Sequence, residues 1–293
     1  MRIDARCARR MDGFQASDLR AGHVCGGRLL MDGATTLATL APLALATCRV
    51  MGVATFAPVV AAAAVPARIR LAIAAVIAVA ALPAIGASGL PAAAIAEPWR
   101  LLPAAALEFA LGAVIGVIAM LPVAAFRTAG SLVGMQAGLG FGQLYDGGSG
   151  EEDGGDAFEQ LFAVLGAACF VWAGGLDALA LSTLRSFDYV ALGAWSPSVG
   201  IVGTVMGAAV AASELAFRVA LPVTAVLVAE AMVSGFVARS VPGIAPLSFG
   251  FPVRFAVAIL ALLAGAAAMQ SAMHGAVAGM LDSMHSAVTG GAA

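Results

Sequence analysis

Charged side chains interrupt the apolar stretches of this sequence at six positions, which makes them the first candidates for a chemical role. Each would cost about 2.5 to 3.5 kcal/mol at the centre of a bilayer, so it should face protein or a water-filled lumen. Glu214 and Arg218 stand four residues apart with the acid first, the order that favours an ion pair within one helix. The pattern indicates a subunit of an assembly or a channel. Besides Asp177, we expect five buried charges: Arg49, Glu108, Glu214, Arg218 and Glu230.

Two aspartates, Asp146 and Asp177, are the residues that an intramembrane aspartyl protease would need as facing carboxylates. Asp146 falls in a glycine-rich stretch that predicts a loop, and the sequence GGLD at Asp177 lacks the GxGD order of such proteases. The segment GLGFG at 138–142 has no preceding strand and no following lysine, unlike a phosphate-binding loop. The cysteines and histidines lack the spacing of metal ligands. We therefore expect no enzyme activity, no cofactor and no metal site.

Glycine recurs at every fourth position before that loop. Positions four apart share one face of a helix, so four such glycines predict a groove in which another backbone can approach closely. The spacing recurs as pairs at 112 and 116, 203 and 207, and 275 and 279, where internal packing alone is the simpler interpretation of any one pair. We expect a close helix contact along the series of four, which consists of Gly130, Gly134, Gly138 and Gly142.

The elements that carry these residues are predicted to be membrane helices. Of the 293 residues, 61% are hydrophobic and 11% charged, and the mean hydropathy is +0.98, values typical of an integral membrane protein. Runs long enough to cross about 30 Å of hydrocarbon lie at 37–60, 69–88, 103–123, 158–181, 205–236 and 251–272, with a weaker candidate at 124–143. The runs lack the alternation of a β-barrel. We predict an all-α polytopic integral membrane protein with about six transmembrane helices.

Prolines in or at the ends of these runs, such as Pro122, Pro222 and Pro252, predict kinked helices arranged as hairpins. Residues 1–33 form a polar, Arg-rich N-terminal extension that is either a tail or a wrongly assigned start. The membrane domain spans 34–285 with a central Gly/acidic loop at 144–156, and 286–293 form a short tail. Arginine-rich segments give conflicting signals for the positive-inside rule, so the orientation stays open.

Four segments in order resemble the FliR family of flagellar export components, whose injectisome counterpart is the SctT family. Residues 49–73 are similar to the family's first hairpin, especially FAP at 56–58 and VPARIR at 65–70. The segment GMQAGLGFGQLYD at 134–146 resembles the glycine-rich segment before the central loop, and LRSFDYVALG at 184–193 the segment after it. The family's last two helices resemble two later segments of this chain, ALPVTAVLVAEAMVSGFVARSVP and GFPVRFAVAILAL. The likeness covers about 37–280.

The sequence departs from the family at three places: PGIAPL replaces the usual Pro-x-Leu-Asn, and Ser131 and Gly147 stand where an acidic residue and a proline are common. The resemblance implies a subunit of an export gate in the bacterial inner membrane, at the flagellar basal body. Its implied partners are FliP-, FliQ-, FlhB- and FlhA-like subunits, the exported unfolded proteins and the lipid bilayer, without nucleic acid. VPARIR and GFPVRFAVAIL favour the flagellar over the injectisome branch.

The resemblance also implies that the loop after the glycine-rich helix helps to plug the closed pore. An apolar stopper would be followed by a glycine hinge, although a simple solvated connection would have the same composition. A small-solute secondary transporter is the other alternative, since kinked helices and buried acids serve it too, but no inverted repeat is apparent. The residues proposed for the plug and gate loop are Phe141, Leu144, Tyr145, Asp146, Gly147 and Gly148.

Overall fold

The computed structural model describes residues 40–58, 66–85, 99, 101–138, 157–197, 199–240 and 246–290. All of the regular secondary structure among these residues is helical, which confirms the predicted all-α class. The first helix covers Leu40–Phe56. The labelled helices are α3 (Ala67–Ile85), α5 (Leu101–Ala137), α7 (Ala157–Trp172), α8 (Gly175–Tyr189), α9 (Val199–Ser240) and α10 (Pro246–Thr289).

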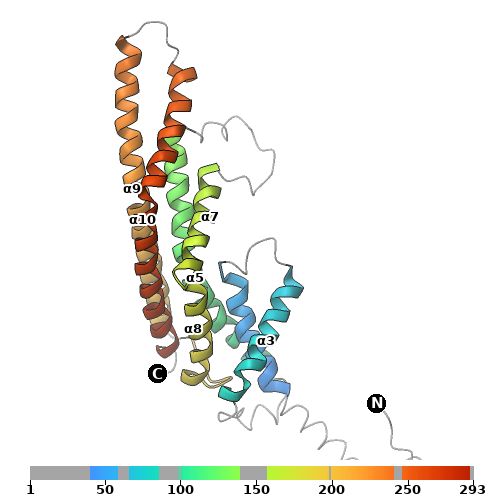
Figure 1. The fold of residues 1–293 in the computed structure, drawn as a ribbon. Coiled ribbons are helices and arrows are strands. Elements are labelled where there is room, and N and C mark those ends of the chain that lie inside the picture. The colour runs from blue at the N-terminus through green and yellow to red at the C-terminus, as the bar shows by residue number, and fades with distance from the viewer. Residues whose placement is uncertain are drawn as a thin grey trace, which may run out of the picture.

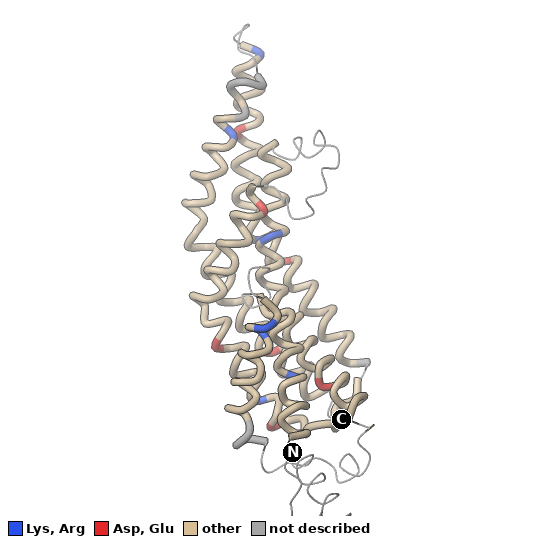
Figure 2. The backbone as a smooth tube through the Cα atoms, turned by 90° about the vertical axis from the view of Figure 1, so that its right-hand side faces the viewer, with Lys and Arg blue, Asp and Glu red and all other residues tan. Residues whose placement is uncertain are grey.

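Three long helices form the body of the elongated molecule. Helix α9 has 42 residues and α10 has 44, so each is about 65 Å long at 1.5 Å per residue. They pack against each other, and α5 packs against both of them. In Figure 1, α9 and α10 lie on one side of α5 and α7 on the other, and the upper ends of α9 and α10 extend beyond the end of α5. Charged residues are sparse along the whole length of the tube in Figure 2.

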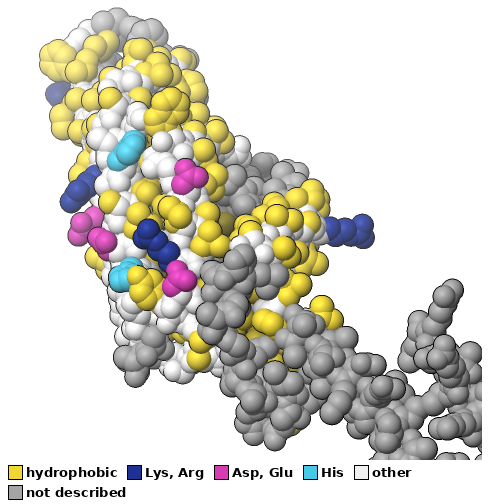
Figure 3. All heavy atoms as spheres, turned by 60° about the horizontal axis from the view of Figure 1, so that its bottom comes forward, with side chains coloured by type: hydrophobic (Ala, Val, Ile, Leu, Met, Phe, Trp, Pro, Cys, Tyr) yellow, Lys and Arg dark blue, Asp and Glu magenta, His cyan; other side chains and the backbone are white. Residues whose placement is uncertain are grey.

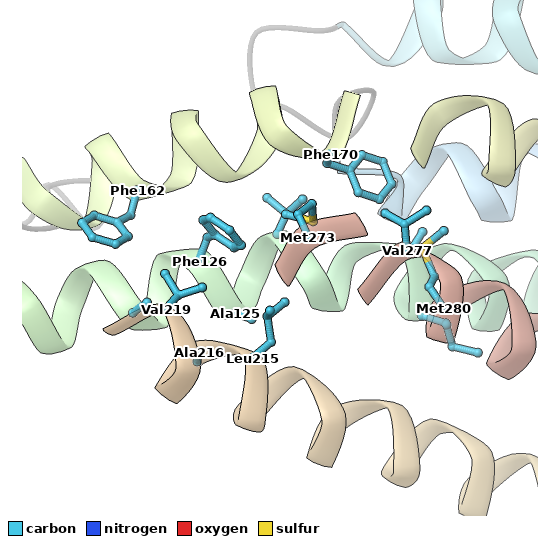
Figure 4. Close-up of a cluster of buried hydrophobic side chains, with 14 of the residues drawn as sticks. Ala125, Phe126, Phe162, Phe170, Leu215, Ala216, Val219, Met273, Val277 and Met280 are labelled. Carbon is cyan, nitrogen blue, oxygen red and sulfur yellow. The ribbon is translucent and has the colours of Figure 1, made fainter. Parts of the chain in front are cut away.

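Side chains from α5, α7, α9 and α10 make up most of the main core, to which the first helix and α8 add a few more. Phe126 of α5 and Phe162 of α7 are fully buried, and Val219 of α9 and Met273 of α10 lie close to Phe126 (Figure 4). The aromatic rings and flexible methionines fill the gaps that small alanines leave between the helices. This core fixes α5 as the central element of the bundle.

A second, smaller core joins the first helix to α3 and to the end of α8. Small alanines of α3, including Ala74 and Ala78, pack against Leu45 and Ala46 of the first helix, and Phe187 of α8 closes the cluster. The N-terminal pair therefore lies beside the lower part of the bundle, near α8, as Figure 1 shows. Most of the remaining surface of α3 is exposed, including Val76 and Val79.

Three described helices are long and apolar enough to cross a membrane: Leu101–Ala137, Gly200–Ser240 and Pro252–Thr289. The pair α7 and α8 together makes a fourth candidate span, bent by 62°. The helix Leu40–Phe56 and α3 occupy the other two predicted ranges, 37–60 and 69–88. A polytopic helical membrane protein is thus confirmed.

Two predicted boundaries were wrong. The range 103–123 and the part of the range 124–143 up to Ala137 belong to one helix, because α5 continues through Pro122. Pro122 removes one backbone hydrogen bond from α5. The packing of α5 on its neighbours offsets this loss, and the helix continues. The range 158–181 is instead broken between Trp172 and Gly175, where Gly174 adopts a φ of 77°. Residues with side chains rarely adopt this conformation, so the glycine allows the chain to turn there.

Candidate functional site: a buried polar junction and the glycine contacts of α5

Arg49 and Glu108 form an ion pair inside the protein. The Nε of Arg49 donates to Oε2 of Glu108 at 2.5 Å, and both side chains have 0% exposure. The two residues come from the first helix and from α5, and they are 59 positions apart in the sequence. A buried charge of this kind needs a partner and further hydrogen bonds to offset the loss of hydration.

The remaining polar atoms of the pair bind the end of α8 and the segment after it. Nη1 of Arg49 donates to the carbonyl of Ser186 at 3.0 Å, and Nη2 donates to the carbonyl of Val190 at 3.2 Å. The backbone N–H of Gly193 donates to Oε1 of Glu108 at 2.8 Å. A cation at the C-terminal end of a helix binds its last carbonyls and suits the helix dipole. We call these groups the Arg49 junction; it joins the first helix, α5 and α8.

An aromatic ring completes the Arg49 junction. The guanidinium carbon of Arg49 lies 4.5 Å from the centre of the Phe187 ring, within the range of a cation–π contact. Phe187 itself is 4% exposed, so the charge is surrounded by ring, carbonyls and carboxylate. The arrangement holds three chain segments in fixed positions and contains no nucleophile or acid–base pair open to a substrate.

Glycines allow the first helix to approach α5 closely at the same place. A Cβ added to Gly112 would collide with the backbone carbonyl of Arg49, and one added to Gly52 would collide with that of Phe109. A Cβ on Gly116 would lie 2.8 Å from the carbonyl of Val53. The pair Gly112 and Gly116 is thus used for internal packing. Close backbone contact brings Arg49 within reach of Glu108.

The glycines of the series of four have different roles where the structure describes them. A Cβ on Gly130 would lie 2.7 Å from the carbonyl of Phe158, so α7 crosses α5 at this residue. Gly134 is buried on the same helix. Gly138 follows the end of α5 with a φ of 89°, where it ends the helix. Gly142 lies outside the described residues.

Another ion pair lies beside the upper end of α5. Nε of Arg254 donates to Oε2 of Glu230 at 3.0 Å, and Nη1 of Arg254 lies 3.4 Å from the carbonyl of Gln136. The Glu230 side chain is 8% exposed, and its Oε1 has no hydrogen-bond partner among the described residues. This pair joins α9, α10 and α5 immediately before the segment that carries the proposed plug.

Glu214 and Arg218, which we expected to be buried, lie on the surface of the chain by itself. Their side chains are 65% and 75% exposed, and they face one another at 3.8 Å on the outside of α9. The neighbouring positions Leu215 and Val219 turn toward the core instead, which leaves the ion pair on the outer face of the helix. Asp177 is also exposed, on α8. Figure 3 shows few charged side chains on this face, some of them with opposite charges next to one another, among many hydrophobic side chains.

The six residues proposed for the pore plug all belong to the range 139–156, outside the described residues. They are Phe141, Leu144, Tyr145, Asp146, Gly147 and Gly148. Within the described part of the chain, no three His, Cys, Asp or Glu side chains gather as a metal site would require.

A comparison of the sequence with known protein families gives a family assignment for the chain. The model of the family described as Bacterial export proteins, family 1, matches residues 40–280, which contain most of the helical core. The chain belongs to this family. It is therefore a membrane component of a bacterial type III secretion or flagellar export system, and its family is one of structural export components that are not known as enzymes. No curated protein matches this export component.

Family membership implies that this export component works together with other subunits of the apparatus. Sequence reasoning singled out Arg49 and Glu108 but not the residues that complete their junction, namely Ser186, Val190, Gly193 and Phe187. Three of these four contribute backbone groups. Because nearly every residue has a backbone carbonyl and N–H, the residue type does not reveal which of these groups take part in the junction. Only the glycine at 193, with a φ of 76°, gives a sequence signal for a turn.

Proposed function

We propose that the chain is a subunit of the inner-membrane gate of a type III export apparatus, in its flagellar branch. In this role it would form, with FliP- and FliQ-like subunits, the pore through which unfolded flagellar proteins leave the cytoplasm. FlhB- and FlhA-like subunits would be its further neighbours at the basal body. The observation that carries the proposal is the family match over 40–280.

The distribution of buried surface supports a role as one subunit among several. In its most apolar stretch, α5 has 56% of its residues buried within the chain, whereas α9 has 22% and α10 has 17%. Both helices thus have long faces that nothing in the described chain covers. Membrane helices associate through close packing of small residues and hydrogen bonds, and these faces hold both kinds of group. A subunit with such faces suits an assembly better than a carrier that works alone.

The choice of the flagellar branch rests on sequence likeness. VPARIR at 65–70 and GFPVRFAVAIL at 250–260 resemble the flagellar family more closely than the injectisome family. The proposed plug, which includes Phe141 and Tyr145, belongs to the same proposal and has the same support: the family resemblance and the glycine and acidic composition of 139–156.

A gene deletion tests the proposal directly. Cells without this chain should lose motility and the secretion of filament protein, and expression of the chain from a plasmid should restore both. Affinity purification of the chain in mild detergent should recover FliP- and FliQ-like proteins. Normal motility of the deletion strain with loss of needle-dependent injection would assign the chain to the injectisome branch. Normal motility together with normal injection would refute the proposal.

A further inference from the structure

Two elements of the bundle lose regular helical backbone near their middle. In α5, Pro122 has no N–H, so the carbonyl of Ile118 lacks its usual helical donor. Between α7 and α8 the chain is broken at Gly174, and the two helix axes differ by 62°. Proline and glycine are residues at which helices kink, so each of these places is a point of low bending resistance.

The other two long helices carry weak points as well. In α10, a Cβ added at Gly275 or at Gly279 would meet no atom within 4 Å, so close packing does not require glycine at either position. Glycine in a helix interior lowers helix stability relative to alanine. In α9, the hydroxyl of Ser213 donates to the carbonyl of Ala209 at 2.9 Å, a bond of the kind that often bends a helix.

Contacts between the helices place these points at one level of the bundle. A Cβ on Gly166 of α7 would meet the ring of Phe126 of α5, and the two helices are antiparallel. The break between α7 and α8, about two turns beyond Gly166, therefore lies level with Pro122 and the turn before it. A cavity of about 370 Å³ at this level is lined by Pro122, by Ala212 of α9 and by Gly275 of α10. The weak points thus surround one space.

Directional contacts join the helices on either side of this level, above and below as drawn in Figure 1. Below it, the Arg49 junction joins the first helix, α5 and α8, and the ring of Tyr189 meets that of His285 on α10 edge-on, with centroids 5.2 Å apart. Above it, Arg254 joins α10 to Glu230 of α9 and to the carbonyl of Gln136 of α5. Each contact holds its own half of the bundle and leaves the level between them free of restraint.

We propose that the chain bends at this level as two rigid bodies and that protein export uses the bend. The upper body comprises α7 with the upper parts of α5, α9 and α10, and the lower body comprises the first helix, α3, α8 and the lower parts. The cavity gives side chains room to move, which a close-packed interior would not. The role in export rests on the proposed function, whereas the bending is a property of the chain by itself. We call this level the hinge layer; it contains Pro122, Gly174, Ser213, Gly275 and Gly279.

A small change of angle at the hinge layer gives a large displacement. The end of α5 at Ala137 is fifteen residues beyond Pro122, about 22 Å along the helix. A change of about 20°, the size at which a helix bend counts as a sharp kink, would move that end by about 8 Å relative to the Arg49 junction. The start of α7 would move with it, because α7 crosses α5 above the hinge layer.

Distances between spin labels test the bend in the full-length chain in lipid nanodiscs. Labelled amino acids at Val164 of α7 and Leu184 of α8 lie on opposite sides of the hinge layer, whereas labels at Val164 and Leu260 of α10 both lie in the upper body; all three side chains are exposed. Each label of the first pair is about ten residues from Gly174, so a change of about 20° alters their separation by about 2 to 3 Å. Double electron–electron resonance should therefore give a distribution broader by about 2 to 3 Å for the first pair.

Alanine at the glycines of the hinge layer should stiffen α10. Gly275→Ala with Gly279→Ala fills open space, and the control, Gly235→Ala with Gly265→Ala, does the same outside the hinge layer. Alanine favours helix over glycine, so both variants should fold. We expect G275A/G279A to remove about half or more of the extra width and to reduce secretion of filament protein by about fivefold, and the control to change secretion by less than about twofold.

A proline exchange gives an independent test. Pro122→Ala restores a donor for the carbonyl of Ile118, and Pro222→Ala does the same in α9 above the hinge layer. P122A should narrow the distribution of the first label pair and lower secretion, and P222A should change neither. Pro122 is buried, so the glycine variants decide the test if P122A proves unstable in detergent.

The possible results separate the two proposals. Equal widths for the two label pairs, or a distribution that G275A/G279A leaves as broad as before, would overturn the hinge layer. Full secretion by the stiffened variants, in cells where deletion of the gene abolishes secretion, would overturn its role in export and leave the proposed function intact. If deletion leaves secretion intact, the proposed function itself fails, and the label distances still decide whether the chain bends.

Discussion

Removal of either charge from the Arg49 junction should destabilise the protein strongly. Arg49→Ala would leave the carboxylate of Glu108 buried, with the N–H of Gly193 as the one donor that remains from the junction. Loss of one partner from a buried ion pair costs about 3 to 5 kcal/mol. Since each 1.4 kcal/mol is a factor of ten, the ratio of folded to unfolded protein should fall by about two to four orders of magnitude. Glu108→Ala should cost a similar amount, because it leaves the guanidinium without a counter-charge.

The two substitutions should not be additive. If both residues become methionine, no buried charge remains, and the apolar pair can be close to neutral by itself. The carbonyl of Val190 and the N–H of Gly193 would then lack their bonds, at about 1 to 3 kcal/mol each. The carbonyl of Ser186 still accepts from the N–H of Val190. The double variant should therefore lose about 2 to 6 kcal/mol. This is less than the combined losses of the single variants Arg49→Met and Glu108→Met, each of which leaves a buried charge unpaired at about 3 to 5 kcal/mol.

The exposed ion pair of Arg127 and Glu159 is the matched control. Its atoms are 3.0 Å apart, but the side chains are 59% and 25% exposed. Arg127→Ala should change stability by at most about 1 kcal/mol. Reversible unfolding of the detergent-solubilised chain, followed by helical circular dichroism during titration with denaturing detergent, measures all variants. Similar losses for R49A and R127A, or additive effects of Arg49 and Glu108, would show that the reasoning on burial is incorrect.

Three further results are expected. Gly112→Ala should destabilise the chain by about 1 to 3 kcal/mol in the same unfolding assay, because its Cβ meets the backbone of Arg49. Gly203→Ala is the control: the space around Gly203 is open, so this variant should be neutral or stabilise the chain by up to about 1 kcal/mol. Equal effects of the two substitutions would contradict this prediction. Gly174→Ala should cost about 1 kcal/mol, since it forces a side chain into a φ of 77°, and a stabilised variant would be evidence against strain. Deletion of 147–155 should make cells leak ions in a conductance assay; an unchanged leak would argue against the plug.

The sequence could predict the helices but not how their polar groups meet. Apolar runs locate the long helices, because membrane length and composition constrain them strongly, but they do not give the ends of α5 or the break between α7 and α8. The sequence does not identify the partner of Arg49. Glu108 is 59 positions away, and Glu230 or Glu214 would have been equal candidates by residue type. Distance along the chain has no bearing on which acid a buried arginine reaches. Only the crossing of the first helix over Gly112 selects Glu108.

The exposure of the charged residues also could not be predicted from the sequence. Glu230 and Glu214 both interrupt an apolar helix, and both have an arginine within reach. Glu230 is nearly buried because α10 passes beside it and brings Arg254, whereas Glu214 pairs with Arg218 of its own helix on the outer face. A helix rotates by about 100° per residue, so the two acids, which are sixteen positions apart in the sequence, lie on different faces. The direction of α10 then decides which one is covered.

Glycines with the same spacing have different physical explanations in this chain. At Gly112 and Gly130 the missing side chain is required, because the backbone of a neighbouring helix occupies its place. At Gly174 the requirement is the backbone angle, with open space around the residue. At Gly275 and Gly279 neither reason applies, although their spacing equals that of Gly112 and Gly116. Spacing therefore identifies a helix face on which contact is possible, and the presence of a backbone against that face decides whether the contact is internal. At Gly275 and Gly279 of α10, the described chain supplies no such backbone.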